Sequence, residues 1–125
     1  MPNIVAIDDE QTCLEIIDFS LRSKGHKVFG FDNSIEAIKF LSNSEDKIDA
    51  ILVDMMMPNM DGIETLERIR QIEKAKFIPI IFQTGTSDYE HLNANEEEHG
   101  VTYIIRKPYK RDELIKMVNL VLSKK

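Results

Sequence analysis

Short apolar runs alternate along the chain with longer stretches in which apolar residues recur at helical spacing. Five runs are apolar enough to be strands that are covered on both faces. They lie at residues 4–7, 28–31, 51–53, 78–82 and 103–105. Between and after them, the spacing predicts helices around residues 13–21, 34–41, 63–72 and 114–122. A fifth helix over 87–100 would be marginal, because that stretch offers little apolar face.

The order of these elements predicts an α/β fold. Strands that alternate with helices need right-handed crossovers, so the sheet should be parallel and have helices on both faces. We therefore predict a doubly wound, five-stranded parallel sheet in the order 2-1-3-4-5 with five helices, the flavodoxin-like arrangement. Two local details belong to this prediction. Ser34 is the expected N-cap of the second helix, and Cys13 should lie on the buried stripe of the first.

Composition and charge narrow the class of protein. The 125 residues suffice for one core and show no linker or repeat, so residues 1–125 are predicted to form one domain. Cys13 is the only cysteine, which suits a reducing compartment. The N-terminus lacks a signal peptide's basic start, and no apolar run could span a membrane. The net charge of −6 disfavours direct nucleic-acid binding. Together these features lead us to expect a cytoplasmic protein without membrane or nucleic-acid partners.

Acidic residues follow two strands that flank the predicted switch point of the sheet. Asp8 and Asp9 come directly after the first strand, and Asp54 follows the third. Ligands of such sheets bind beyond the carboxyl ends of the strands at this point. Like charges held close together destabilise a fold unless a cation neutralises them. Oxygen ligands without Cys or His favour a hard ion, so the sequence predicts Mg²⁺ rather than zinc.

Thr84 lies at the end of the fourth strand and Lys107 just after the fifth, and both thus reach the same edge of the sheet. An ammonium group suits a phosphate oxygen, a hydroxyl can donate to one, and an aspartate attacked by a phosphoryl donor becomes an acyl phosphate. Taken singly, Asp8 and Asp9 could cap a helix, Asp54 could form a turn, and the other two could be ordinary surface and strand residues. Packing does not require all four strand ends to carry such groups, so the combination favours phosphoryl transfer to Asp54.

The same residues resemble the response-regulator receiver family of two-component signalling, including its chemotaxis regulators, over essentially the whole chain. The stretch 54–62, which reads DMMMPNMDG, is similar to the family's phosphoacceptor loop. The other matches are Asp8 and Asp9 to its metal-binding acids, Thr84 and Gly85 to its threonine and small residue, and Lys107 and Pro108 to its lysine and cis-proline.

The resemblance implies a role for each acidic residue. Asp54 would be the phosphoacceptor. Mg²⁺ would be bound directly by Asp9, by Asp54 and by the backbone carbonyl of Met56, whereas Asp8 would act mainly through water. The domain would catalyse its own phosphorylation and dephosphorylation, and it would not be an enzyme that acts on an external substrate.

The resemblance also implies a switch region made of Thr84, Gly85, Ile104 and Tyr103. Lys107 would contact the phosphoryl group, and Thr84 would swing toward it and let an output face repack. The family usually has Tyr or Phe three residues before the lysine, where this sequence has Ile104. Strand side chains alternate, so Tyr103 should point to the opposite face. We therefore expect the response to pass through loops and helices, with the 87–100 stretch as a candidate.

The partners implied are a histidine kinase or a histidine phosphotransfer protein, docking near Gln11, Thr12 and Leu14, and a downstream protein or output domain. A homodimer through the output face is a further implied arrangement. Two other functions compete with this interpretation. One is a Mg²⁺-dependent aspartyl-phosphate phosphohydrolase, although Met56 stands where such enzymes usually carry a second Asp. The other is a phosphorylation-silent interaction module, against which the intact set of site residues argues.

Overall fold

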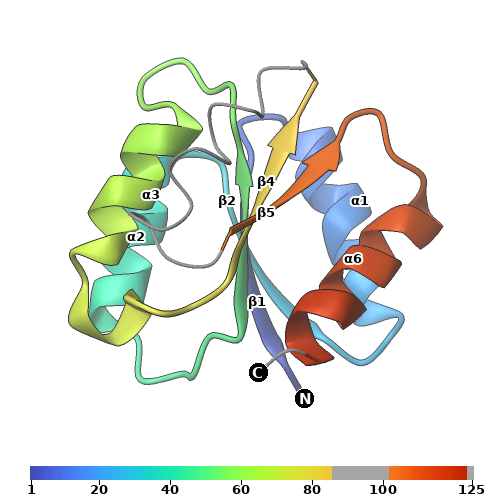
Figure 1. The fold of residues 1–125 in the computed structure, drawn as a ribbon, viewed down its shortest axis with the longest axis horizontal. Coiled ribbons are helices and arrows are strands. Elements are labelled where there is room, and N and C mark those ends of the chain that lie inside the picture. Colours follow the sequence, from blue (N-terminus) through green and yellow to red (C-terminus); the bar gives the residue numbers. More distant parts are fainter. Residues whose placement is uncertain (86–101, 124–125) are drawn as a thin grey trace.

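A five-stranded parallel sheet forms the centre of the computed structural model, which describes residues 1–85 and 102–123. The strands run in the order β2-β1-β3-β4-β5 (Figure 1). Their bounds are Asn3–Ile7 for β1, Lys27–Phe31 for β2, Ala50–Asp54 for β3, Ile80–Thr84 for β4 and Thr102–Arg106 for β5. This order and the parallel pairing confirm the predicted fold class.

Helices cover both faces of the sheet (Figure 1). Helices α2 (Ser34–Asn43) and α3 (Gly62–Arg70) lie on one face, and α1 (Gln11–Arg22) and α6 (Arg111–Ser123) lie on the other. A short 3₁₀ turn, η1 (Glu73–Ala75), follows α3. The fifth helix predicted over 87–100 lies outside the described residues.

Two apolar clusters lie against the two faces of the sheet, as the alternation of strand side chains requires. Ile4 and Leu52 pack with α1 and α6, whereas Val5 and Ile51 pack with α2 and α3. Because both faces are covered, β1 and β3 are apolar along nearly their whole length. Because these strands are buried on both faces, their apolar runs were enough to predict them from the sequence.

The predicted cap of α2 is wrong by one residue. The side chain of Asn33 accepts a hydrogen bond from the Glu36 N–H at 2.9 Å, so Asn33 is the N-cap and Ser34 is the first helical residue. The Ser34 hydroxyl lies 2.7 Å from the Thr65 hydroxyl, where it joins α2 to α3. Asp61 caps α3 in the same way, accepting from the Glu64 N–H.

The predicted buried stripe of α1 also needs correction. Leu14, Ile17 and Leu21 face the sheet, whereas Cys13 is only partly buried and Ile16 is 51% exposed. Neighbouring helical positions differ by about 100° around the axis, so a one-residue error in the stripe turns a side chain away from the core.

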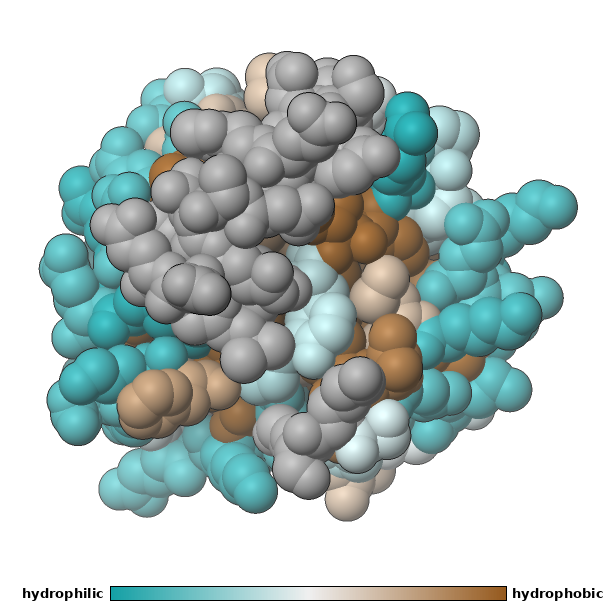
Figure 2. Space-filling view, viewed as in Figure 1, coloured by the Kyte–Doolittle hydropathy of each residue, from teal (hydrophilic) through white to brown (hydrophobic). Residues whose placement is uncertain are grey.

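The surface follows from this layering. In Figure 2 the outer sides of both helical layers are mainly hydrophilic, and hydrophobic surface shows near the middle, where β5 lies in Figure 1. Within the described parts of the chain, no helix is long and apolar enough to cross a membrane.

Gly62, the first residue of α3, lies close to Met55 and Phe82, so a substitution there tests how tightly α3 packs against the sheet. A Cβ at this position would lie 2.8 Å from Met55 Sδ, 3.0 Å from Met55 Cα and 3.1 Å from Phe82 Cε1. Gly62→Ala should therefore destabilise the domain by about 1–3 kcal/mol in urea unfolding, because overpacking displaces backbone.

Gly30→Ala is the matched control, since its Cβ would meet only Leu14, at an ordinary 3.7 Å. That variant should stay within about 0.5 kcal/mol of the wild type. Equal stability of the two variants would contradict the packing described here.

Candidate functional site

Three carboxylates meet at the carboxyl ends of β1 and β3. Asp8 and Asp9 follow β1, Asp54 is the last residue of β3, and their oxygen atoms lie within 4.8 Å of one another. Asp8 is fully buried and Asp54 is 6% exposed, whereas Asp9 is exposed. Among the described residues this is the only group of three or more possible metal ligands. The structure thus brings together the acids that the sequence placed at this edge.

Backbone hydrogen bonds orient the two buried acids. The Asp8 N–H donates to the Phe31 carbonyl at 3.0 Å, and Asp8 Oδ1 accepts from the Glu10 N–H at 3.0 Å. Asp54 Oδ1 accepts from the Met56 N–H at 3.3 Å. Glu10 is the N-cap of α1, so neither Asp8 nor Asp9 caps that helix. Instead, the Asp8 side chain closes the turn between β1 and α1.

Lys107 reaches this cluster from the end of β5. Its Nζ lies 3.0 Å from Asp8 Oδ2 and 3.7 Å from Asp54 Oδ1, and its side chain is only 23% exposed. Its N–H donates to the Thr84 carbonyl at 2.7 Å, and the following bond to Pro108 is cis, as expected. Lys107 therefore lies beside the acidic cluster and is not a solvated surface charge.

Burial and neighbouring charges shift the titration of this pair. Burial, reinforced by the charge of Asp8, raises the pKa of Asp54 to about 6, although Lys107 opposes the shift. Burial alone would lower the pKa of Lys107, but its hydrogen bond to Asp8 and the charge of Asp54 outweigh burial and raise it. Lys107 thus stays charged at neutral pH, and Asp54 is mainly ionised there.

The remaining predicted residues lie at the same edge. Thr84 ends β4 and is 2% exposed, and a Cβ added at the neighbouring Gly85 would meet no atom of the described residues within 4 Å. Met56 is 69% exposed next to Asp54, and its N–H already faces the carboxylate. The donor set of the cluster is entirely oxygen, which fits a hard divalent cation.

Comparison with known proteins decides the family. The family model of the response regulator receiver domain matches residues 4–119. The chain belongs to this family. Receiver domains are signalling domains, and the acidic cluster described above is typical of phosphoryl acceptance from a kinase partner.

Individual relatives share this domain. The CheAY sensor histidine kinase of Helicobacter pylori is 34% identical over 116 residues, which are 92% of this chain and 14% of the kinase. The ORR5 response regulator of Oryza sativa subsp. japonica is 26% identical over 121 residues, 97% of this chain and 89% of that protein. The chain spans only 16% of the SKN7 transcription factor of Chaetomium thermophilum.

Solved structures agree with the fold. The chemotaxis protein CheY4 of Vibrio cholerae matches with a TM-score of 0.88 and 26% identity over 98% of this chain and 99% of that one. The receiver domain of the sensor histidine kinase PA1611 from Pseudomonas aeruginosa matches with a TM-score of 0.80 and 26% identity, covering 98% of each chain. That structure holds a magnesium ion coordinated in its active-site cleft.

Two expectations about the receiver's surfaces can now be compared with the structure. Ile104 packs with the cluster under α2 and α3, and Tyr103 packs with the cluster under α1 and α6, so their opposite orientation is confirmed. Of the residues expected to meet a kinase, Gln11 and Thr12 are exposed, whereas Leu14 is buried in the cluster between α1 and the sheet.

Sequence reasoning missed one polar pair beside the site. Tyr109 donates a hydrogen bond through its hydroxyl to Oε1 of Gln83, which is fully buried in β4 next to Thr84. Burial raises the pKa of Tyr109, so its hydroxyl keeps its proton and remains a donor. The signal that could have revealed the pair is a glutamine at the end of an otherwise apolar strand.

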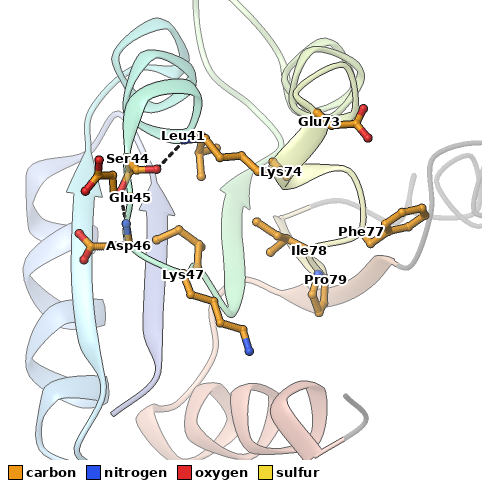
Figure 3. Close-up of a pocket in the computed structure, with 12 residues that line it drawn as sticks. Leu41, Ser44, Glu45, Asp46, Lys47, Glu73, Lys74, Phe77, Ile78 and Pro79 are labelled. Carbon is orange, nitrogen blue, oxygen red and sulfur yellow. Dashed lines mark hydrogen bonds between the residues drawn. The ribbon is translucent and has the colours of Figure 1, made fainter.

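A groove of about 610 Å³ lies away from these residues, near the amino ends of β3 and β4 (Figure 3). Leu41, Ile48 and Ile78 form its apolar part, and the Lys74 ammonium donates to the Ser44 carbonyl at 2.6 Å. The carboxylate cluster lies at the opposite ends of the strands, so this groove is not part of the receiver site.

The raised pKa of Asp54 predicts how the metal-free receiver responds to pH. The folded state holds this proton up to about pH 6, whereas the unfolded chain releases it near 3.8. The folded state therefore binds more protons between these values, and Asp54 makes the domain less stable as pH rises through this window.

Asp54→Asn removes the ionising group and keeps the shape. In chelator at pH 7 it should raise the free energy of unfolding by about 1–3 kcal/mol, and the gain should vanish near pH 4. Urea unfolding of both proteins across this pH range measures the difference. A variant that is less stable than wild type at pH 7 would contradict the assigned burial of Asp54.

Proposed function

We propose that Asp54 is the phosphoacceptor of this receiver and that the phosphoryl group comes from a histidine kinase or a histidine phosphotransfer protein. The observation that carries the proposal is the position of the Asp54 carboxylate. One oxygen is held by the Met56 N–H and lies 3.7 Å from Lys107 Nζ, within the acidic cluster. This is the arrangement of charge that an acyl phosphate requires.

We assign Mg²⁺ as the cofactor. Asp9, Asp54 and the Met56 carbonyl would hold it directly, and Asp8 would contribute mainly through water. When bound, the ion would supply positive charge that balances the carboxylates and the phosphoryl oxygens. The all-oxygen donor set and the excess of carboxylates over ammonium groups in the cluster support this assignment.

The transfer forms one bond and breaks another. A bond forms between an Asp54 carboxylate oxygen and phosphorus, while the bond between phosphorus and the donor's histidine nitrogen breaks and leaves its electrons on the imidazole. Asp54 must be ionised to attack, which a pKa of about 6 permits at neutral pH. The pKa of Lys107 is raised, so its ammonium group stays charged near Asp54 and would bind a phosphoryl oxygen.

Thr84 and Gly85 would read the phosphoryl group. The Thr84 hydroxyl would donate to a phosphoryl oxygen, and Gly85, which has no side chain, would leave room for the movement. Because Ile104 and Tyr103 face opposite sides of β5, the output surface would respond through loop and helix movement and not through an aromatic at 104. A downstream protein, an output domain or a second copy of the chain would bind that surface.

We also propose that residues 1–125 are one receiver domain in the cytoplasm. The family match over residues 4–119 and described elements from Asn3 to Ser123 support the extent. The free thiol of Cys13 suits a reducing compartment.

Intact mass after incubation with Mg²⁺ and acetyl phosphate tests the acceptor. One phosphoryl adduct should form on the wild type and should be absent with chelator or in Asp54→Asn. Asp61→Asn is the matched control, because Asn also caps helices well and Asp61 lies at the start of α3. An adduct on Asp54→Asn would refute the assignment, and release of phosphate without an adduct would indicate a phosphohydrolase.

Lys107→Ala tests the charge of the site. The variant should slow phosphorylation by acetyl phosphate about tenfold or more, because it removes the ammonium group that faces the reacting carboxylate. Lys110→Ala is the control, since Lys110 is exposed three residues later and should react at the wild-type rate. Equal rates for the two variants would exclude Lys107 from the reaction.

A further inference from the structure

A buried amide connects the strand beside Asp54 to the loop after Lys107. Gln83 is fully buried in β4, and its Oε1 accepts the hydrogen bond from the Tyr109 hydroxyl at 2.5 Å. Its Nε2 is also buried and has no hydrogen-bond partner among the described residues. Among the described residues, the hydrogen-bond partner of the Gln83 side chain is thus Tyr109.

The end of β4 is hydrogen-bonded both to the segment that follows Asp54 and to Lys107. Gln83 is the register partner of Asp54, and its carbonyl accepts from the Met55 N–H at 2.9 Å. The next carbonyl, that of Thr84, accepts from the Lys107 N–H at 2.7 Å. The segment from Lys107 to Tyr109 is therefore attached to β4 at its first residue through the backbone and at its third through a side chain.

We infer that Gln83 and Tyr109 are positioning residues for phosphorylation, and that their hydrogen bond sets the reach of Lys107 toward Asp54. The inference rests on the proposed function. Without this bond, the loop after β5 would keep the backbone hydrogen bond at Lys107 and lose the side-chain hydrogen bond at Tyr109. The Lys107 ammonium would then occupy a wider range of positions, and fewer of them would be productive.

A purely stabilising role does not account for the pair. Gln83 lies on the side of β4 that Ile81 also occupies, within an apolar cluster that Tyr109 joins. A buried amide nitrogen without a partner destabilises the fold, whereas replacing both partners of a hydrogen bond by apolar groups can be neutral or stabilising. Leu at position 83 and Phe at position 109 would pack at least as well as Gln83 and Tyr109. What the polar pair adds is a hydrogen bond that fixes the orientation of the loop after β5.

The test compares rate with stability in the full chain. The double variant Gln83→Leu/Tyr109→Phe should be at least as stable as the wild type in urea unfolding, yet about fivefold slower in phosphorylation by acetyl phosphate with Mg²⁺. Tyr109→Phe, which removes a single oxygen atom, serves as the second variant and should be slowed similarly. Phosphorylation of both variants at the wild-type rate would overturn the inference.

A second comparison asks whether the pair acts through Lys107. In a Lys107→Ala background, Tyr109→Phe should cause no further loss of rate, because the group that it positions is already absent. A loss of the same size with and without Lys107 would show that Tyr109 acts elsewhere and would overturn the inference.

Amide hydrogen exchange followed by NMR tests positioning even if the wild type takes no phosphoryl group, an outcome that would refute only the proposed function. In Tyr109→Phe the Lys107 amide should exchange faster, because the loop that holds it against Thr84 is loosened. The Lys27 amide, which donates to the Pro2 carbonyl at 2.8 Å, is the internal control. Unchanged exchange of Lys107 would overturn the inference independently of any phosphorylation.

Discussion

The close approach of Lys107 to the buried acids is the interaction on which the site depends. Its ammonium lies 3.0 Å from Asp8 and 3.7 Å from Asp54, in surroundings where the carboxylates are largely withdrawn from water. Low polarity strengthens both the repulsion between carboxylates and their attraction to a cation. Positive charge among these acids therefore stabilises their ionised forms at this edge of the sheet.

The sheet supplies the rigidity that this balance of charge needs. β1 and β3 are buried from both sides, and the acids stand at or directly after their last residues. The first residue after each strand is held by a backbone hydrogen bond. The Asp8 N–H donates to the Phe31 carbonyl, and the Met55 N–H donates to the Gln83 carbonyl. Phosphoryl transfer relies on positioning and on fixed charge more than on covalent chemistry by the protein, so strand ends suit it better than free loops.

Accepting a phosphoryl group on Asp54, as proposed, would add negative charge where negative charge is already in excess. The groups able to respond belong to β4 and to the connection between β5 and α6. Lys107 and Thr84 are joined through a backbone hydrogen bond, and Tyr109 and Gln83 through a side-chain hydrogen bond. A change of charge at one strand end can thus reach the start of α6 through groups in direct contact.

The layers and most of the acidic cluster could be predicted from the residue pattern alone. Apolar runs marked the strands because both faces of the sheet are covered, and Asp8, Asp54 and Lys107 stood out because strand ends have no packing need for charge. Features that depend on the orientation of side chains became known only from the folded structure. It moved the α2 cap from Ser34 to Asn33, turned Cys13 partly outward, and brought Lys107 to Asp8 across 99 residues and Tyr109 to Gln83 across 26. Local patterns record which residues are apolar, but a helix's rotation and the meeting of distant side chains are set only when the layers pack together.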